Sequence, residues 1–355
     1  MPIPTEPIGS IPRPAELIDA WGARQRGQMS DERFRAISDA ALLDTIRRFE
    51  ETGSPVITDG EQTKPSFATY PLDGPLALAP DGVVVPFADG HTRQLPRLTR
   101  GPFRYGTHAS TYLTAAQRLT KRPVKQAVIS ASALSLLYPD PAIPDYPRES
   151  FLEDLVEEAV LDIRQCLDGG ADSVQIDFTE GRLALKLDPT GGLLDQFVSL
   201  NNTVLGRFSD DERRRIGVHT CPGGDRDSTH SADVDYAGLL PTLFRLRAGR
   251  FYVQLASERE PERVLRLISE HRTADQVVFV GVTDPINPVP ETEQQVCERV
   301  LLAARYIPVS SLGTTDDCGF APFADDASTS RDTAFQKIRA RVAGTTLAER
   351  SLDVS

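Results

Sequence analysis

Short runs of β-branched and apolar residues recur along the chain, and segments with helical periodicity separate them. The runs are continuous or nearly so, which is typical of strands that are buried on both faces of a parallel sheet. The clearest runs cover residues 55–59, 126–130, 173–177, 216–219, 251–255 and 277–281. This pattern predicts a parallel sheet covered by helices.

The number of repeats predicts how the sheet is arranged. Helical patterns cover residues 31–51, 148–167, 193–208, 236–247, 261–271, 291–306 and 330–342. With a first strand near residues 6–9 and a last one near 308–314, the chain holds about eight β/α repeats, the number that closes a barrel. We therefore predict an α/β fold with a single (β/α)8 TIM barrel. A doubly wound open sheet is the alternative, but no G-x-G-x-x-G motif follows a predicted strand.

Residues 65–110 interrupt the alternation. This segment is rich in proline and glycine, and it contains the run VVVPF at residues 83–87 followed by a polar turn at Asp89 and Gly90. Such a pattern is typical of a hairpin. We predict an inserted hairpin or lid between the second and third barrel strands, within one domain that spans residues 1–355.

Composition and charge limit the partners of the chain. Of the 355 residues, 40% are hydrophobic and 25% are charged, as in ordinary globular proteins, and the net charge is −12. The acidic balance argues against a nucleic-acid partner, because phosphate binding relies on clustered Lys and Arg. No stretch approaches the roughly 20 apolar residues that span a bilayer, and the first residues lack the features of a secretory signal. These observations predict a cytoplasmic protein with no membrane partner, and they allow a homo-oligomer.

The four cysteines are expected to be thiols or metal ligands in a reducing compartment. Cys166 and Cys297 fall within helical patterns and are expected to be buried, inert thiols. Cys221 and Cys318 instead follow predicted strands. In a closed barrel such positions form the mouth, where catalytic groups gather.

His219 and Cys221 have a spacing that suits a metal site. Side chains at positions i and i+2 of a strand point to the same side, so both residues can face the barrel mouth. Cys318, after the last strand, is the natural third ligand. A His nitrogen and a Cys thiolate are the commonest zinc ligands, and a catalytic zinc takes three protein ligands and keeps one position open. The alternative is a hydrogen-bonded core histidine beside an incidental thiol.

Six short motifs occur in order along nearly the whole chain. They are EPIGSIPRP at residues 6–14, ITDGEQ at 57–62, VQID at 174–177, HTC at 219–221, GVTDPINP at 281–288 and LGTTDDCG at 312–319. Together they resemble the catalytic C-terminal barrel of the cobalamin-independent methionine synthase family, within the methionine synthase and uroporphyrinogen decarboxylase-like superfamily. The resemblance implies a zinc-dependent methyltransferase of methionine biosynthesis, in which zinc holds the thiol of homocysteine.

The resemblance also implies roles for individual residues. His219, Cys221 and Cys318 correspond to zinc ligands. The fourth ligand of the family, a glutamate, does not map cleanly. Gln254 and Glu258 are both near its position, and we prefer Glu258 because carboxylates are regular zinc ligands. The alternative role for Glu258 is an exposed carboxylate in the first turn of a helix.

The substrate-binding residues of the family have counterparts as well. Ile8, Gly9 and Ser10 resemble its contacts to the substrate carboxylate, while Glu61 and Asp177 resemble the acids that bind the substrate ammonium. As an alternative, Asp177 and the nearby Asp59 would cap the helices that follow them.

Some features of the family are absent from this sequence. No aromatic residue stands within residues 129–132, where the family has a folate-stacking tryptophan, and a family histidine thought to assist proton transfer falls at Ile286 or Asn287. The separate N-terminal barrel of the family is missing too. The methyl donor is therefore left open as a folate, a corrinoid or another compound.

Two other functions remain as alternatives. One is zinc-dependent addition of a thiol to an epoxide, as in the related epoxyalkane:coenzyme M transferase. The other is a non-catalytic barrel that binds zinc or an amino acid. Glu61 and Asp177 suit an ammonium and so disfavour coenzyme M, whose thiol carries a sulfonate.

Three further features lie beside the predicted site. Residues 223–235 contain His230 and four aspartates, and they predict either a loop over the substrate or a capped turn with Ser231 or Asp233 as N-cap. Residues 178–186 either direct Glu180 and Arg182 toward the substrate or form a solvated hairpin. Arg13 and Lys64 are the nearest cations for an anionic group on the second substrate.

Overall fold

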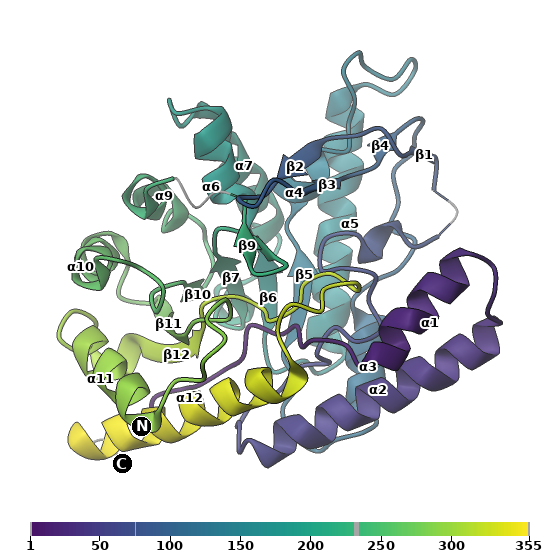
Figure 1. The fold of residues 1–355 in the computed structure, drawn as a ribbon. Coiled ribbons are helices and arrows are strands. Elements are labelled where there is room, and N and C mark those ends of the chain that lie inside the picture. The colour runs from purple at the N-terminus through teal and green to yellow at the C-terminus, as the bar shows by residue number, and fades with distance from the viewer. Residues whose placement is uncertain (1, 75, 231–233, 354–355) are drawn as a thin grey trace.

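A parallel sheet lies at the centre of the computed structural model, which describes residues 2–74, 76–230 and 234–353 (Figure 1). The strand order is β12-β11-β10-β7-β6-β5, and all neighbours are parallel. The bounds are Gln126–Ile129 (β5), Val174–Asp177 (β6), Ile216–Thr220 (β7), Arg250–Val253 (β10), Val277–Thr283 (β11) and Leu312–Asp316 (β12). These six strands match six of the eight predicted ones, and nearly all of their residues are buried, as the continuous apolar runs predicted.

The two remaining predicted strands are short extended segments at the two edges of the sheet. Thr5 forms a single parallel bridge with Thr314 of β12, and Ile57 forms one with Val124, just before β5. The two segments also contact each other, since the Ile11 amide donates to the Gly60 carbonyl at 3.0 Å. The sheet is therefore confirmed as a six-stranded parallel sheet, and its predicted edge strands are too short to count as regular strands.

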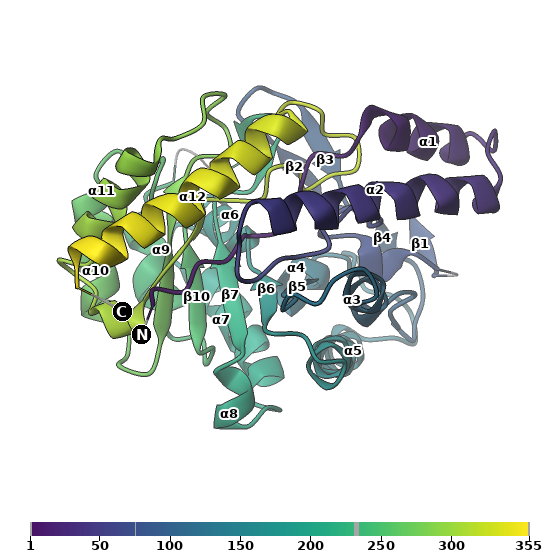
Figure 2. The same ribbon diagram turned by 90° about the horizontal axis from the view of Figure 1, so that it is seen from below.

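Helices follow the strands in the predicted alternation. The predicted helices appear as α2 (Asp31–Glu51), α5 (Arg148–Asp168), α7 (Gly192–Leu205), α9 (Tyr236–Leu243), α10 (Pro261–His271), α11 (Glu293–Ala303) and α12 (Arg331–Ser351). Others had no clear periodic signal: α1 (Ala15–Gln25), α3 (Ser110–Gln117), α4 (Ala131–Ser135), α6 (Glu180–Leu187) and α8 (Asp210–Arg213). When the molecule is seen from below, α2 and α12 lie in front, with the two termini next to each other (Figure 2). Phe49 of α2 packs edge-on against Phe335 of α12.

The solvated hairpin considered for residues 178–186 is wrong. The segment is helix α6, and it packs against α7 and α9. As a consequence, Glu180 and Arg182 are buried rather than solvated.

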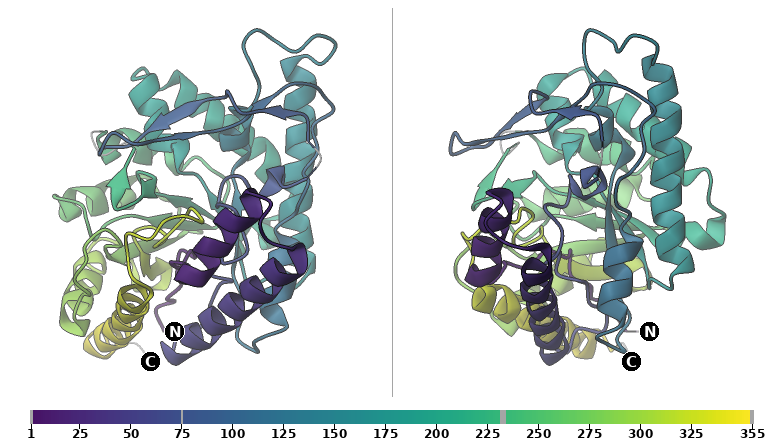
Figure 3. Two further views of the ribbon diagram at one scale, coloured as in Figure 1. Left: turned by 45° about the vertical axis from the view of Figure 1, so that its right-hand side comes forward. Right: turned by 90° about the vertical axis from the view of Figure 1, so that its right-hand side faces the viewer.

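Antiparallel pairs do occur within residues 65–110. Strand β2 (Val84–Pro86) pairs with β3 (Thr92–Gln94), and β1 (Leu78–Ala79) pairs with β4 (Arg97–Leu98). The polar turn at Asp89 and Gly90 lies between β2 and β3, as the sequence predicted. Figure 3 shows from two sides that this segment extends across the upper part of the molecule.

Candidate metal and substrate site

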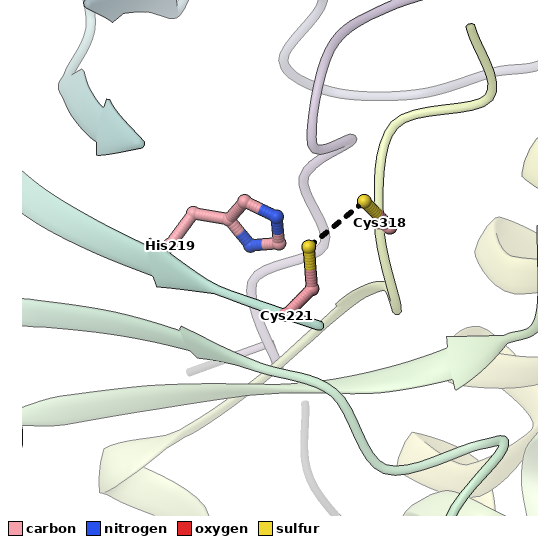
Figure 4. A group of neighbouring side chains, drawn as sticks. All are labelled: His219, Cys221 and Cys318. Atoms are coloured by element: carbon pink, nitrogen blue, oxygen red, sulfur yellow. Dashed lines mark hydrogen bonds between the residues drawn. The ribbon is translucent and has the colours of Figure 1, made fainter. Parts of the chain in front are cut away.

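His219, Cys221 and Cys318 lie together at the carboxyl edge of the sheet (Figure 4). One potential ligand atom from each residue falls within 4.8 Å of the others, and the two sulfur atoms are 3.0 Å apart. His219 lies within β7, Cys221 follows its last residue, and Cys318 follows β12. The i, i+2 spacing thus directs two side chains to one side, and the sheet brings in a residue from a strand 97 positions further along the chain.

The donor set of this cluster suits a metal ion. Both ring nitrogens of His219 are buried and have no hydrogen-bond partner among the described residues. A hydrogen-bonded core histidine, the alternative considered above, would have such a partner. Two thiol groups and an unpartnered imidazole are ligands that zinc prefers, so these residues could hold zinc.

Glu258 lies outside this cluster. Its Oε1 atom accepts hydrogen bonds from Arg182 at 2.7 Å and from Gln254 at 3.1 Å. Arg182 also stacks on Tyr236, with its guanidinium carbon 3.8 Å from the ring centroid. The structure therefore pairs Glu258 with an arginine, a contact that local sequence could not reveal.

A small cavity of about 30 Å³ adjoins His219 and Cys318. The predicted substrate residues Ile8, Ser10, Glu61 and Asp177 line it as well, although they come from segments far apart in the sequence. Gly9, the remaining predicted contact, has its carbonyl bound by Thr58 Oγ1 at 2.9 Å. The structure thus brings the predicted metal ligands and most of the predicted substrate contacts to one place.

Both acids in this cavity are buried. Burial raises the pKa of Glu61 to about 7 although Lys64 opposes the shift, and burial also raises the pKa of Asp177. Glu61 Oε2 has no partner among the described residues. Asp177 accepts from Gln175 at 2.8 Å and caps no helix, whereas Asp59 accepts from the Glu61 amide at 3.1 Å. Asp177 therefore does not have the capping role considered as an alternative.

Arg13 and Lys64 have structural partners and do not face an open anion site. Arg13 is buried and donates to backbone carbonyl groups, among them those of Glu61 and Lys64. Lys64 Nζ contacts Glu61 Oε1 at 3.2 Å and donates to the Ala127 carbonyl at 3.0 Å. Burial alone would lower the pKa of Lys64, but the carboxylates of Glu61 and Asp59 raise it above its ordinary value. Neither cation is therefore free to bind a substrate anion.

A larger cavity of about 620 Å³ lies beside the small one, and the two share Gly223 and Gly224. Its wall is largely apolar and includes aromatic residues that sequence reasoning did not select. These residues are Trp21, Phe67, Phe87 and Phe323. They come from α1 and from loops, so no periodic signal marked them.

Glu180 is the buried acid of this larger cavity. Its Oε1 atom accepts hydrogen bonds from Ser130 at 2.6 Å and from Ser132, while Oε2 has no partner among the described residues. Burial raises the pKa of Glu180 to about 7. Helix α6 thus contributes a buried acid to the wall of a largely apolar cavity.

The loop after β7 contacts the cluster, since the Gly223 amide donates to Cys221 Sγ at 3.3 Å. It contains β8 (Gly224–Asp225) paired with β9 (Ser228–Thr229). Ser231 and Asp233, the predicted N-caps, lie outside the described residues, and α9 is capped by Asp235, whose side chain accepts from the Ala237 amide. A third cavity of about 680 Å³ is lined by residues of this loop together with Cys318, Arg182 and Glu258.

Comparison with curated proteins identifies relatives. No protein-family model matches the chain. A 5-methyltetrahydropteroyltriglutamate–homocysteine methyltransferase of Synechococcus is 24% identical over 331 residues, which are 90% of this chain and 40% of the relative. A methionine synthase of Pyrococcus furiosus is 20% identical over 324 residues, 89% of this chain and 86% of that protein. The chain thus spans about 40% of the length of the first relative.

Solved structures share the fold. A B12-independent methionine synthase from Shewanella sp. W3-18-1, in complex with selenomethionine, has a TM-score of 0.78 at 18% identity and covers 99% of both chains. A putative B12-independent methionine synthase from Listeria monocytogenes has a TM-score of 0.71 at 22% identity, with 97% of both chains covered.

The chain is therefore similar in sequence and fold to cobalamin-independent methionine synthases. The resemblance predicted from the six motifs is confirmed by these relatives and by the shared fold. The departure from this family at residues 129–132 has a structural counterpart. Ser130 and Ser132, at the positions where the resemblance led us to expect an aromatic residue, donate hydrogen bonds to the buried Glu180.

The helices of the described residues can be compared with the requirements of a membrane span. None of the helices in those parts of the chain has the length and apolar character needed to cross a bilayer.

Proposed function

We propose that this chain transfers a methyl group to the thiol of a homocysteine-like amino acid with the help of zinc. The observation that carries the proposal is the cluster of His219, Cys221 and Cys318, in which both nitrogens of His219 have no hydrogen-bond partner among the residues that the structure describes. Zinc, when bound, would lower the pKa of a coordinated thiol so that the nucleophilic thiolate is present at neutral pH. We further propose that residues 1–355 form one closed (β/α)8 barrel, with residues 65–110 as an inserted lid.

The residues of the small cavity would orient the amino acid. Glu61 and Asp177 would bind its ammonium, since an ammonium is attracted to carboxylates within about 4 Å. An ammonium would also favour the charged form of both acids and so lower their pKa values. The backbone of Ile8 and Gly9 and the hydroxyl of Ser10 would hold the carboxylate. This would leave the thiol directed at His219 and Cys318, which line the same cavity.

We propose two alternatives for the fourth ligand of the zinc ion. Glu258 would supply a carboxylate if it exchanged its contact with Arg182 for the metal. Otherwise the position would be open for the thiol substrate, as in catalytic zinc sites with three protein ligands.

The 620 Å³ cavity would hold the methyl donor. It adjoins the thiol cavity through Gly223 and Gly224, and its apolar walls with one buried acid suit a flat, mostly apolar compound with polar edges. A folate, a corrinoid and other methyl compounds remain candidates.

Thiol addition to an epoxide is the second candidate function, and a non-catalytic barrel is the third. The two buried acids beside the thiol position disfavour a sulfonate thiol such as coenzyme M, because like charges would repel. A comparison of turnover with homocysteine and with coenzyme M separates the first two functions. Zinc without any turnover would support the third.

The test begins with metal analysis of protein purified without chelator. We expect about one zinc per chain, as for a catalytic site with a single metal. Cys221→Ser and Cys318→Ser should each lose most of the zinc and the homocysteine-dependent demethylation of methyltetrahydrofolate or methylcobalamin. Cys297→Ser is the matched control, because Cys297 is a buried thiol on α11 outside the cluster. Zinc-free wild-type protein with full activity would contradict the proposal.

A further inference from the structure

Lys125 is a fully buried lysine that the proposed methyl transfer has not yet used. It comes directly before β5, and its Nζ atom donates to Gln175 Oε1 at 2.8 Å. The same atom lies 3.7 Å from Glu6 Oε2 and 4.1 Å from the centre of the Tyr252 ring. Burial lowers the pKa of Lys125 to about 8 although the Glu6 carboxylate opposes the shift. The side chain is therefore mostly charged at neutral pH.

The amide of Gln175 has one orientation that suits all of these neighbours. A charged lysine offers donors and no acceptor, so the side-chain oxygen of Gln175 must face Lys125. The amide nitrogen then donates to the Ile8 carbonyl at 3.1 Å and to Asp177 Oδ1 at 2.8 Å. The reverse orientation would place the amide oxygen against two other acceptors and the nitrogen against an ammonium. Lys125 therefore determines which way the amide points.

Both acceptors of this amide are proposed contacts of the amino-acid substrate. Ile8, Asp177 and Gln175 line the 30 Å³ cavity, whereas Lys125 does not. Ile8 lies 167 positions from Gln175 in the sequence, so the amide joins the N-terminal segment to β6. Any effect of Lys125 on a substrate in this cavity would therefore pass through Gln175.

Glu6 does not depend on Lys125 alone for compensation of its charge. It also pairs with Arg250 at 2.6 Å and accepts a hydrogen bond from the Tyr252 hydroxyl at 2.6 Å. Without the lysine, Glu6 would keep a cation and a hydrogen bond. The oxygen of Gln175 would instead lose the donor that orients it.

We propose that Lys125 is a positioning residue for the amino-acid end of the thiol substrate and acts through Gln175 on Asp177 and Ile8. This inference rests on the proposed binding of an amino-acid thiol in the small cavity. The oriented amide holds the carboxylate that would bind the substrate ammonium. It also holds the backbone segment that would bind the substrate carboxylate. Without Lys125 both contacts would lose their preorganisation, so the affinity for the amino acid would fall.

The test measures the binding of two thiols to the zinc-loaded full chain by calorimetry. Homocysteine carries an ammonium and a carboxylate, whereas propane-1-thiol has only its sulfur and a carbon chain. Lys125→Met should weaken the binding of homocysteine about 10-fold or more, as expected for the loss of a hydrogen bond to a charged group. The affinity for propane-1-thiol and the zinc content should stay unchanged. Lys337→Met is the matched control, because Lys337 is equally buried, contacts Glu291 at 3.0 Å and does not line the cavity.

A second variant tests whether the effect passes through the amide. Gln175→Met removes the group that Lys125 orients, and it should weaken the binding of homocysteine at least as much as Lys125→Met does. In the double variant, the further loss on adding Lys125→Met should be less than about twofold, because residues that act as one unit are not additive. If Lys125→Met alone does not fold, Gln175→Met still allows the two thiols to be compared.

Three results would overturn the inference. Equal losses for both thiols in Lys125→Met would indicate a general effect on the fold or on the metal. Unchanged affinity for homocysteine in either single variant would show that the amide does not position the substrate. Fully additive losses in the double variant would show that Lys125 acts by another route. The proposed function would fail by a different result, namely a zinc-loaded wild type that does not bind homocysteine.

Discussion

Two acids of the candidate site, Glu61 and Glu180, have pKa values close to neutral pH. Burial raises the pKa of each to about 7, and each keeps one oxygen without a partner among the described residues. Their roles differ because their neighbours differ. Glu61 contacts a buried lysine, which favours its charged form, whereas Glu180 accepts hydrogen bonds from the hydroxyl groups of Ser130 and Ser132 and forms no ion pair among the described residues.

Replacing Glu180 by glutamine should change how stability depends on pH. The folded state keeps Glu180 protonated up to about pH 7, while the unfolded chain releases that proton near pH 4.5. The folded state thus binds more protons between these values, so the free energy of unfolding falls as pH rises through this window. In Glu180→Gln, the decrease in the free energy of unfolding across this pH window should be smaller than in the wild type by at most about 3 kcal/mol.

Urea unfolding of the apoprotein between pH 4.5 and 8 measures this effect. Glu157→Gln is a suitable control, because Glu157 lies on the surface and pairs with the exposed Arg207. Identical pH dependence in wild type and Glu180→Gln would show that Glu180 is charged in the folded state at pH 5.

For individual residues, the periodicity of the strands predicted the direction of the side chains of His219 and Cys221. The direction of His219 and Cys221 depended only on assigning their strand correctly. The position of Cys318 depended on the last strand ending at the same edge of the sheet, although β10 and β11 lie between β7 and β12. The partner of Glu258 could not be predicted, since Arg182 lies 76 positions earlier and reaches it only through the packing of α6. Spacing directs side chains, but it does not reveal which charge lies opposite.

The hairpin of β2 and β3 is held to the loop after β7 by one buried acid. Asp225 has a fully buried side chain, and it accepts hydrogen bonds from Arg93 at 2.5 and 3.2 Å and contacts His91 at 3.0 Å. The Ala88 amide also donates to the Thr229 carbonyl at 2.8 Å. These contacts hold the β2–β3 hairpin, part of the proposed lid, against the loop after β7.

Asp225→Asn should loosen this lid. The change removes the charge opposite Arg93 in a buried place, where such losses cost roughly 1 to 3 kcal/mol. Exchange of the Ala88 amide hydrogen should therefore become about 10-fold faster or more. Asp81→Asn is the control, since Asp81 forms an exposed pair with Arg97 near the other end of the hairpin strands. Equal exchange rates in both variants would show that Asp225 does not hold the lid.

Helices and strands with strong periodicity were predicted well, and short elements were not. The limits of α2 and α10 match the prediction, because a serine cap or a proline at the first position marks their starts. Helix α6 was ambiguous because its eight residues give too little periodicity to distinguish a helix from a strand. Its helical form depends on α7 and α9, which local sequence does not reveal.

Buried charges join the two ends of the chain inside the molecule. Arg341 on α12 has no exposed side-chain surface, and it donates to Asp316 of β12 at 2.6 Å and to the Glu6 carbonyl at 2.8 Å. Glu6 in turn pairs with Arg250 at 2.6 Å and lies 3.7 Å from Lys125. This network links the N-terminal segment to the edge of the sheet where the proposed barrel would close.

Arg341→Met should destabilise the whole molecule. It would leave the buried carboxylate of Asp316 without its cation, and breaking a buried pair costs about 3 to 5 kcal/mol. Arg245→Met is the comparison, because Arg245 and Asp195 form an exposed pair that contributes less than about 1 kcal/mol. The free energy of unfolding in urea measures both. A loss below 1 kcal/mol for Arg341→Met would mean that Asp316 is protonated or finds another partner.

The sequence by itself determined the order of strands and helices and the side of the sheet to which His219 and Cys221 point. Both follow from local periodicity, which acts over a few residues. The tertiary structure alone decided how the charges are paired and which aromatic residues line the 620 Å³ cavity. These contacts join segments separated by tens to hundreds of positions, and burial of their polar groups is tolerated only where the fold supplies a partner or leaves a place for a ligand.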